Sequence, residues 1–542
     1  MPDVTDHNAP STLSPTESTT SIGAGSNGKD DLIRRRVVIG TVANYGGKIV
    51  ALAAGFFLTP FILHEVGAAT YGIWVLAGVV VQYGTLLDLG MSNAVIKYVA
   101  EHRALDDMEL AGKLVATVLC LYTALGVLVA VVIVALAPLF GEAFRIPVDQ
   151  RGTATWLIII LGINLGLTLP CTITSAVLRG LQRFGLVNIL AVAGTLVGVA
   201  CTITVLLLGG GILAVALISI PIMLLLQIPA VIFVKRSAPE LRLGWRGGSR
   251  SLARVVLTYS GPTLFIQLGG TVQSRMDAIV IAALKPVALV TPYSFALRLS
   301  EIPQILTDQF MKLILPLASE LHAESDRARL RGLFVTGTRL TLALFLPVAA
   351  VMVILAPQIL AAWVGAQYSP YAYLVVILTA GVGIDIALWP AGSILQGMAR
   401  QRAFAISALC TAAANLALSI ILLQHVGLAG VALGTLIPAA FEAVFVLSWT
   451  SRILIVGVVS VLKEILLPPL IPLIPTCFLL LVFAQILHSP SLLLLLVISA
   501  AAGLTYAGGY VVFGASAYER RAYQGLMRDA LRYARTRASA SQ

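Results

Sequence analysis

The sequence predicts an all-α membrane protein with about fourteen transmembrane helices. Of its 542 residues, 58% are hydrophobic and only 11% are charged, whereas charged residues make up about 25% of soluble domains. The apolar residues lie in runs of roughly 20 or more, and each run is long enough to span ~30 Å of hydrocarbon as a helix. A transmembrane β-barrel would instead show weak alternation over ~10-residue segments.

The elements follow in order from the amino terminus. Residues 1–31 are rich in Ser, Thr, Pro and Gly, and we expect a disordered cytoplasmic tail. The first span, "VVIGTVANYGGKIVALAAGFFLTPFIL", is too long for a cleaved signal peptide and lacks a clear cleavage site, so it should be retained. The segment from Tyr83 to Asp107 reads, with the apolar residues before it, as one long helix. Hydropathy places the later spans at approximately 71–97, 112–140, 153–177, 187–208, 212–234, 255–284, 290–317, 334–356, 371–397, 404–424, 426–449, 465–487 and 490–514.

Basic residues predict how the chain is oriented in the membrane. Lys and Arg gather in every second loop, including "KRSAPELRLGWRGGSRSLAR" at 235–254, whereas the alternate loops hold only Arg145, Arg151 and Lys285. Because basic loops stay on the cytoplasmic side, both termini should be cytoplasmic and the number of spans even. This rule, together with anionic lipid at the inner leaflet, accounts for the net charge of +11. The charge is dispersed among loops, which argues against nucleic-acid binding.

The two halves of the chain resemble each other. In "SAVLRGLQRFGLVNIL" and "GSILQGMARQRAFAISAL", three residues match three others at one constant offset: Leu178, Gly180 and Arg183 with Leu395, Gly397 and Arg400. Further, "YVAEHRALDD" matches "LASELHAESD". Since each half has six spans, both copies enter the membrane from the same side, which predicts a parallel repeat of two lobes around a central cavity. We expect a tail (1–31), an N-lobe (32–234), a basic cytoplasmic linker (235–254), a C-lobe (255–450), two further helices (451–514) and a basic cytoplasmic tail (515–542).

Several spans carry polar stripes. A charge inside the membrane costs roughly 2.5–3.5 kcal/mol on insertion scales, so such residues normally face a protein interior or water. In the second span Gly84, Asp88 and Ser92 should share a face that looks into the lobe or the cavity. In the seventh, Arg275 and Asp277 are about 200° apart around the helix, so we do not expect both to face one cavity. The first span carries a stripe of Thr41, Asn44, Lys48, Ala51, Gly55 and Thr59, and the eighth one of Arg298, Glu301, Ile305, Asp308 and Lys312.

The cations in these stripes predict an anion-binding cavity. Lys48 with Asn44 comes from one lobe, and Arg275 and Arg298 come from the other. Arg grips phosphate with a two-pronged fork, while Lys acts as a mobile point charge. The alternative for each cation is a salt bridge between helices, which for Arg298 would involve Glu301.

Three buried acids, Asp88, Asp277 and Asp385, are candidates for binding a coupling proton or sodium ion.

The five cysteines lie inside apolar runs and the histidines form no cluster, so we expect neither a metal site nor a cofactor.

Two stretches, "LLDLGMSNAVIKYVAEHRALDD" and "LRGLQRFGLVNIL", resemble the polysaccharide-transporter branch of the MOP (multidrug/oligosaccharidyl-lipid/polysaccharide) superfamily, the Wzx-type flippases. The resemblance extends over roughly 35–514. It implies two six-helix lobes in a V, alternating access, and a cationic lumen for an undecaprenyl-pyrophosphate-linked oligosaccharide, with Lys48, Arg275 and Arg298 in the corresponding places. It also implies transfer from the inner to the outer leaflet of the bacterial inner membrane for exopolysaccharide, O-antigen or capsule assembly, with the polymerase and co-polymerase of that pathway as partners.

Three other functions stay open at this point. A MATE-type exporter of organic cations shares the superfamily fold; Lys48 in the first span argues against it, while Asp88 and Asp385 keep it open. A lipid II flippase would have the same layout. A membrane enzyme acting on lipid-linked sugars would need a sizeable outer loop, and the longest one, 141–152, is too short to build a site. We therefore expect a transporter and not an enzyme.

Overall fold

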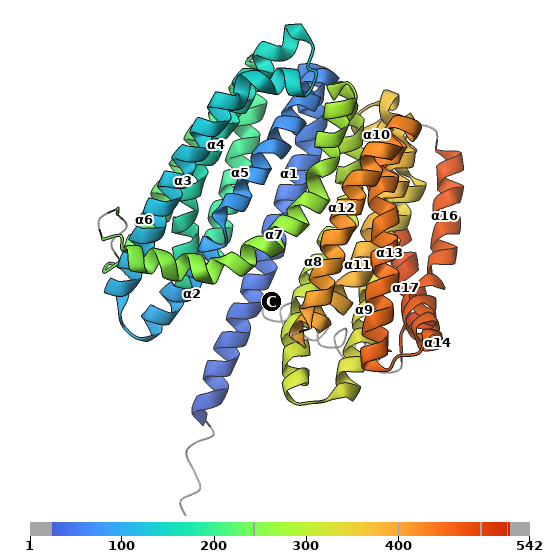
Figure 1. Cartoon of the computed structure of the whole chain (residues 1–542). Coiled ribbons are helices and arrows are strands. Elements are labelled where there is room, and N and C mark those ends of the chain that lie inside the picture. Colours follow the sequence, from blue (N-terminus) through green and yellow to red (C-terminus); the bar gives the residue numbers. More distant parts are fainter. Residues whose placement is uncertain are drawn as a thin grey trace, which may run out of the picture.

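In the computed structural model the chain forms two helical lobes that meet at one end (Figure 1). The part of the chain that the structure describes consists only of helices and turns, so the predicted all-α class is confirmed. The two terminal tails lie mostly outside this part, although the first helix begins at Ala24, within the segment expected to be a tail. The structure describes residues 24–241, 244–245, 247–398, 400–487, 490–516 and 519–520, without the side chains of 24–45, 85, 259–274, 306, 309–310, 312–313, 401, 403, 458 and 462.

The N-lobe contains the elements up to Ser237. Its first helix is two helices that meet at Gly67, whose φ of 78° departs from helical geometry and is readily adopted by glycine. The elements are α1 (Ala24–Gly84), η1 (Thr85–Asp88), α2 (Met91–Ala104), α3 (Met108–Ala143), α4 (Val148–Gly180), α5 (Phe184–Leu207) and α6 (Gly211–Ser237).

The segment from Tyr83 to Asp107 is not one long helix, and that prediction was wrong. After α1 ends, the chain tightens into the 3-10 turn η1, and Leu89 (φ 52°) and Gly90 (φ 76°) then take left-handed conformations before α2 starts. The left-handed conformation at these two residues breaks the run of helical hydrogen bonds. Asp88 thus lies in a turn beside the amino-terminal end of α2, where the helix dipole favours a negative charge.

The C-lobe is built from the elements between Arg250 and Leu454. Its first helix, α7 (Arg250–Leu284), crosses between the lobes: it contacts α2 and α3 of the N-lobe and also α12 and α13 (Figure 1). The other elements are η2 (Val287–Leu289), α8 (Val290–Ala323), α9 (Arg327–Ile354), α10 (Ala356–Trp363), η3 (Ala366–Tyr371), α11 (Ala372–Gly397), α12 (Gln401–Val426) and α13 (Leu428–Leu454).

The two lobes have the same order of neighbours. In the N-lobe α2, α3 and α4 pack on one another, α6 packs on α4 and α5, and α1 packs on α5. In the C-lobe α8, α9 and α11 pack on one another, α13 packs on α11 and α12, and α7 packs on α12. Helices in the same ordinal position therefore make the same contacts, which supports the internal repeat.

The repeated glycine has the same packing role in both lobes. A Cβ atom on Gly180 would lie 2.8 Å from the Cβ of Val99 in α2, and one on Gly397 would lie 2.9 Å from the Cβ of Ala318 in α8. Real Cβ atoms essentially never approach so closely, so each of these helix crossings requires a residue without a side chain.

The turn into the third helix of each lobe is also repeated. Asp106 and Ser325 have left-handed φ angles of 59° and 58°. The next residue in each lobe is an N-cap: the Asp107 carboxylate accepts a hydrogen bond from the backbone N–H of Leu110 (3.1 Å), and that of Asp326 accepts one from Arg329 (2.9 Å). Each cap satisfies a backbone donor that would otherwise lack a partner.

A carboxy-terminal group of helices packs against α9, on the outside of the C-lobe (Figure 1). A buried ion pair joins it to the lobe: Arg339 of α9 lies 2.7 Å from the carboxylate of Glu519, and the two side chains are only 10% and 6% exposed. The group consists of α14 (Val458–Ser460), the π-helical η4 (Val461–Leu466), α15 (Leu467–Leu470), α16 (Leu473–Ile486), α17 (Leu492–Gly509) and the π-helical η5 (Tyr510–Gly514).

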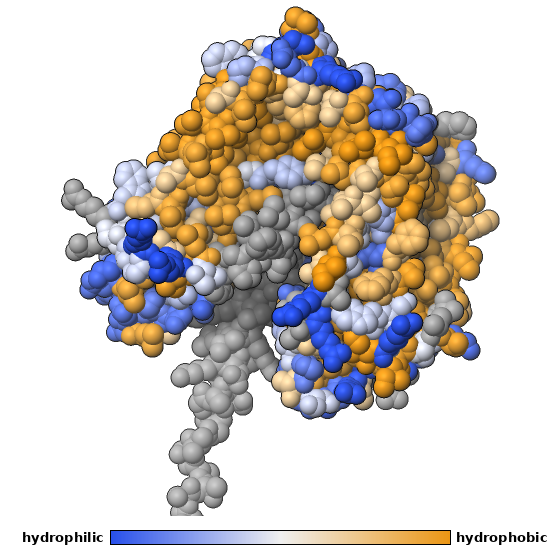
Figure 2. Space-filling model, in the orientation of Figure 1, coloured by the Kyte–Doolittle hydropathy of each residue, from blue (hydrophilic) through white to orange (hydrophobic). Residues whose placement is uncertain are grey.

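The outer surface suits a membrane. Figure 2 shows a broad hydrophobic belt over both lobes, with hydrophilic residues gathered toward the two ends. In the described part of the chain, 11 helices are long and apolar enough to cross a bilayer; Gly46–Ala104 counts once among them, and neither α7 nor α8 is included. The number fourteen therefore stays a prediction.

Candidate functional site

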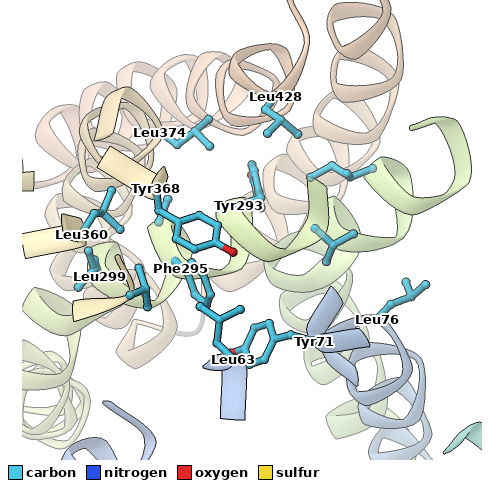
Figure 3. Close-up of a cluster of buried hydrophobic side chains, with 14 of the residues drawn as sticks. Leu63, Tyr71, Leu76, Tyr293, Phe295, Leu299, Leu360, Tyr368, Leu374 and Leu428 are labelled. Atoms are coloured by element: carbon cyan, nitrogen blue, oxygen red, sulfur yellow. The ribbon is translucent and has the colours of Figure 1, made fainter. Parts of the chain in front are cut away.

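The lobes are closed against each other near Gly67. The Thr291 hydroxyl donates a hydrogen bond to the carbonyl of Ala68 (2.7 Å) across the interface. Gly72 lies so close to η2 that a Cβ there would be 2.6 Å from the carbonyl oxygen of Val287. Figure 3 shows aromatic and aliphatic side chains of both lobes gathered at this end. The space between the lobes is thus sealed here by a packed apolar plug.

A proline in α1 helps to fasten this closure. Pro60 has no N–H, so the carbonyl of Phe56, four residues earlier, loses its usual helical donor. The indole N–H of Trp363, from the C-lobe, donates to that carbonyl at 2.6 Å. The Trp363 ring also stacks on Phe56, with centroids 4.6 Å apart and planes within 6°.

Next to the plug lies a cavity of about 280 Å³ between the lobes. Arg275 and Asp277 both border it, so the prediction that they would not face one cavity was wrong. The separation of about 200° describes only their Cα positions; Arg275 extends toward α8, whereas Asp277 borders the cavity from the buried side of α7. The lining residues are Trp74, Val75, Gly78, Val79 and Gln82 of α1, Arg275, Asp277 and Ala278 of α7, and Val290, Tyr293, Ser294, Leu297 and Arg298 of α8.

Two of the three predicted cations are paired with carboxylates. The ammonium of Lys48 lies 2.9 Å from Asp308, which joins α1 to α8 across the lobes. Arg275 lies 3.2 Å from Glu301. The side chains of both pairs are 27–39% exposed, and ion pairs this accessible to solvent contribute little stability.

Arg298 differs from the other two cations. The alternative in which it pairs with Glu301 is not realised, because Arg275 occupies that carboxylate. Arg298 is exposed and donates to the hydroxyl of Thr59 (2.9 Å) and, at 3.4 Å, to the carbonyl of Gly55. Among the described side chains, no carboxylate lies within ion-pair distance of Arg298: its hydrogen bonds go to neutral groups, and the charge of Glu301 acts on it from farther away.

A second cavity, of about 270 Å³, lies inside the C-lobe and is lined by four acids, Asp277, Glu301, Asp385 and Glu442. Asp277 is 5% exposed and borders both cavities. One of its carboxylate oxygens accepts hydrogen bonds from Tyr293 and Thr435, while the other, Oδ1, is buried without a hydrogen-bond partner among the described residues. Such a group suits a proton or a small cation.

Glu301 and Glu442 were not predicted as members of this cluster. Glu442 sits on α13, 7% exposed, and accepts a hydrogen bond from Ser407 (3.0 Å). The signal for Glu301 was its place in the polar stripe of the eighth span. For Glu442 the only signal was a lone acid in an apolar span.

Asp88 lies inside the N-lobe and is not among the residues that line either of these two cavities. Its carboxylate accepts hydrogen bonds from Ser92 (2.7 Å) and from the hydroxyl of Tyr122 on α3. These contacts tie α3 to the broken segment before α2. The remaining predicted site residue, Asn44, has its side chain outside the described part of the structure.

Two helical lobes that close against each other at one end, beside a shared cavity, form a fold that this chain shares with solved structures of membrane transporters. One described as lipid II flippase MurJ in an inward closed conformation has a TM-score of 0.67 at 13% identity, over 87% of this chain and 98% of that one. An inward-facing MATE family multidrug transporter of the MOP superfamily has a TM-score of 0.58 at 15% identity, over 77% and 94%. A MOP superfamily transporter from Pyrococcus furiosus has a TM-score of 0.54 at 16% identity, over 79% and 96%.

The family is shown by sequence as well. Residues 66–373, more than half of the chain, match the family described as "Polysaccharide biosynthesis protein". The chain therefore belongs to this polysaccharide biosynthesis family, as the resemblance predicted, and its fold is similar to that of transporters of the MOP superfamily. No curated protein matches it.

Proposed function

We propose that the protein is a flippase that moves an undecaprenyl-pyrophosphate-linked oligosaccharide from the inner to the outer leaflet of the bacterial inner membrane. The observation that carries the proposal is the cavity between the lobes, which is closed at one end and bordered by Arg298 and Arg275, with Lys48 on the facing lobe. The exported glycan would serve exopolysaccharide, O-antigen or capsule assembly, with a polymerase and a co-polymerase as downstream partners.

The physical need for such a protein is clear. A sugar–pyrophosphate headgroup cannot cross hydrocarbon unaided, because every polar group without a partner costs several kcal/mol. A basic cavity replaces the hydrocarbon for the headgroup while the polyprenyl chain stays in lipid. A membrane potential that is negative inside favours outward movement of the anion by about 2.3 kcal/mol per charge per 100 mV.

The predicted orientation in the membrane decides which side of the membrane the open end of the inter-lobe cavity faces. If both termini are cytoplasmic, as the basic loops predict, the closed end near Gly67 faces outward and the structure is inward-facing. Phosphate would then compete with Asp308 for Lys48. Breaking this inter-lobe ion pair loosens the contact between α1 and α8, which is the step that alternating access requires. A reporter active only outside the cytoplasm, fused after Gln542, should give no signal; a strong signal would contradict this orientation.

We further propose that the acids of the C-lobe, above all Asp277 with Asp385, bind the coupling proton or sodium ion. Asp277 borders both the acid-lined cavity and the inter-lobe cavity, so gain or loss of its proton changes the electrostatic potential in both. Asp88, which is held by Ser92 and Tyr122, would instead fix the break between α1 and α2.

The test is export in a strain that lacks the gene. Arg298→Ala, Arg275→Ala and Lys48→Ala should each abolish glycan export while the protein stays inserted, and Lys48→Arg should retain more export than Lys48→Ala. Arg331→Ala, at an exposed position at the start of α9, is the matched control and should export normally. Full complementation by all three alanine variants would overturn the proposal.

A second candidate, a lipid II flippase, is favoured by the fold similarity to MurJ over 98% of that chain. The two functions differ in the lipid that accumulates when the gene is deleted. Accumulation of the peptidoglycan precursor would favour the lipid II flippase, and accumulation of another polyprenyl-linked glycan would favour the main proposal.

A further inference from the structure

The closed end of the inter-lobe cavity contains a stripe of side chains that the proposal above does not use. Trp74, Gly78 and Gln82 follow one another at intervals of four along α1, so they share one helical face, and all three line the cavity. They lie opposite Ser294 and Arg298 of α8. The cavity is therefore bordered by an indole, an amide and a guanidinium, with an uncovered stretch of helix between the first two.

The shape of the cavity depends on Gly78. A Cβ atom on this residue would meet no other atom within 4 Å, so the space beside it is open and glycine is not needed there for helix packing. This contrasts with Gly180 and Gly397, whose neighbours leave no room. Trp74, one turn away, is half-buried and packs against the core of the closed end, which holds its ring in place.

We propose that this stripe is a specificity-determining subsite for a single sugar ring, the one attached directly to the phosphate of the cargo. The apolar face of the sugar would stack on the Trp74 indole in the space left open by Gly78. Its hydroxyls would exchange hydrogen bonds with the Gln82 amide, and the adjoining phosphate would meet Arg298. The inference rests on the proposed flippase function and adds which part of the cargo is recognised, and where.

The size and chemistry of the cavity favour this ligand over others. Its volume of about 280 Å³ lies just below the ~300–1,000 Å³ typical of small-molecule sites, so it suits one ring rather than a whole oligosaccharide. An alkyl chain would place the Arg298 guanidinium against hydrocarbon, which is costly for a charged group.

The test compares two soluble short-chain probes on purified full-length protein. The first is citronellyl pyrophosphate, and the second is citronellyl pyrophosphate carrying one sugar, prepared with glucose, galactose or N-acetylglucosamine. At least one sugar-bearing probe should bind the wild type about tenfold more tightly than the sugar-free probe, a difference within the range of a well-placed small group in a pocket. Trp74→Ala and Gly78→Leu should each remove this difference, while citronellyl pyrophosphate still binds both variants in an Arg298-dependent manner.

Gly78→Leu is the decisive variant, because it fills the cavity without removing any packed group. Its matched control is Gly503→Leu in α17, where a Cβ also meets no atom within 4 Å; this control should keep the sugar-dependent difference. Trp74→Phe, which keeps an aromatic ring, should retain part of it.

The outcomes separate the two proposals. If citronellyl pyrophosphate does not bind the wild type, or binds Arg298→Ala equally well, the cationic cavity itself is refuted. If it binds in an Arg298-dependent manner but no sugar increases the affinity, or Gly78→Leu keeps the increase, only the sugar subsite is refuted.

Discussion

The two lobes share a scaffold but differ in their interiors. Both have the same order of helix neighbours, the same close helix crossing at Gly180 and Gly397, and the same aspartate caps at Asp107 and Asp326. The interior of the N-lobe is mostly neutral: Asn164 donates to Ser219 (2.5 Å) and Thr174 to Gln227 (2.6 Å). The C-lobe instead has an acid-lined cavity.

This difference shows which positions the fold requires and which are available for function. The glycines at the close helix crossings and the aspartates that cap the helices are the same in both copies. Each copy has the same helix packing, so each needs a residue without a side chain at the crossing and an acceptor for the unpaired backbone N–H groups. Polar groups in the helix interiors have no such requirement, and there the two copies differ. The comparison predicts that matched changes at scaffold positions act alike in the two lobes, and that matched changes in the interiors do not.

The sharpest test of the comparison is to neutralise one acid in each lobe. Asp277→Asn should reduce transport of a fluorescent lipid-linked sugar into proteoliposomes by more than about tenfold, a loss that corresponds to ~1.4 kcal/mol of activation free energy. Asp88→Asn should retain most of the transport, because an amide oxygen still accepts the hydrogen bonds of Ser92 and Tyr122. Equal losses in both variants would remove the proposed functional difference between the lobes.

The ion pair between Arg339 and Glu519 has no counterpart at the matching position of the N-lobe: the residue of α3 that lies as far from the capping Asp107 as Arg339 lies from Asp326 is Cys120. Because the pair is buried, Glu519→Ala should lower the free energy of unfolding by about 3–5 kcal/mol by leaving a buried charge without a partner. Thermal unfolding in detergent measures this effect. The double variant Arg339→Met with Glu519→Met should recover much of the loss; no recovery would mean that the pair does more than balance charge.

The close helix crossings should respond alike in the two lobes. Gly180→Ala and Gly397→Ala should each destabilise the protein by about 1–3 kcal/mol, because the new methyl group overlaps Val99 or Ala318. Gly185→Ala, where a Cβ meets no atom within 4 Å, is the control and should be neutral or slightly stabilising. A large effect in only one lobe would show that the two crossings are not equivalent.

The smallest expected effects are at the helix caps. Asp107→Ala and Asp326→Ala should each cost about 1 kcal/mol, since each removes one hydrogen bond to an otherwise unpaired backbone N–H. Asn at the same positions, which caps equally well, should restore stability in both lobes. A failure of Asn to do so would indicate that the negative charge matters more than the hydrogen bond.

Much of the scaffold could be predicted from the sequence. Composition and apolar runs indicated the all-α membrane class, and the matched "LRGLQR" and "LQGMAR" segments indicated two lobes. The break before α2 was missed, although Gly84 and Gly90 flank it, because an apolar run between glycines reads as a helix when only hydropathy is considered. Features with a clear local pattern in the sequence were predicted, and the break, which hydropathy alone does not reveal, was not.

The pairing of charges could not be predicted in the same way. Sequence spacing pairs Glu301 with Arg298, three residues away, yet its ion-pair partner is Arg275, and this outcome depends on how α7 packs on α8. Arg298 instead donates a hydrogen bond to the hydroxyl of Thr59, which belongs to the other lobe. The partner of Lys48, Asp308, lies in the other lobe and far away in sequence. Such choices depend on contacts between distant segments, which no local pattern records.

The hydrogen bond from Trp363 ends on a main-chain oxygen that Pro60 has set free, and the one from Thr291 ends on another main-chain oxygen, that of Ala68. Every amino acid offers the same carbonyl. The residues of α1 that line the inter-lobe cavity can therefore be substituted without loss of these two hydrogen bonds, so the closed end can persist while the lining of the cavity changes.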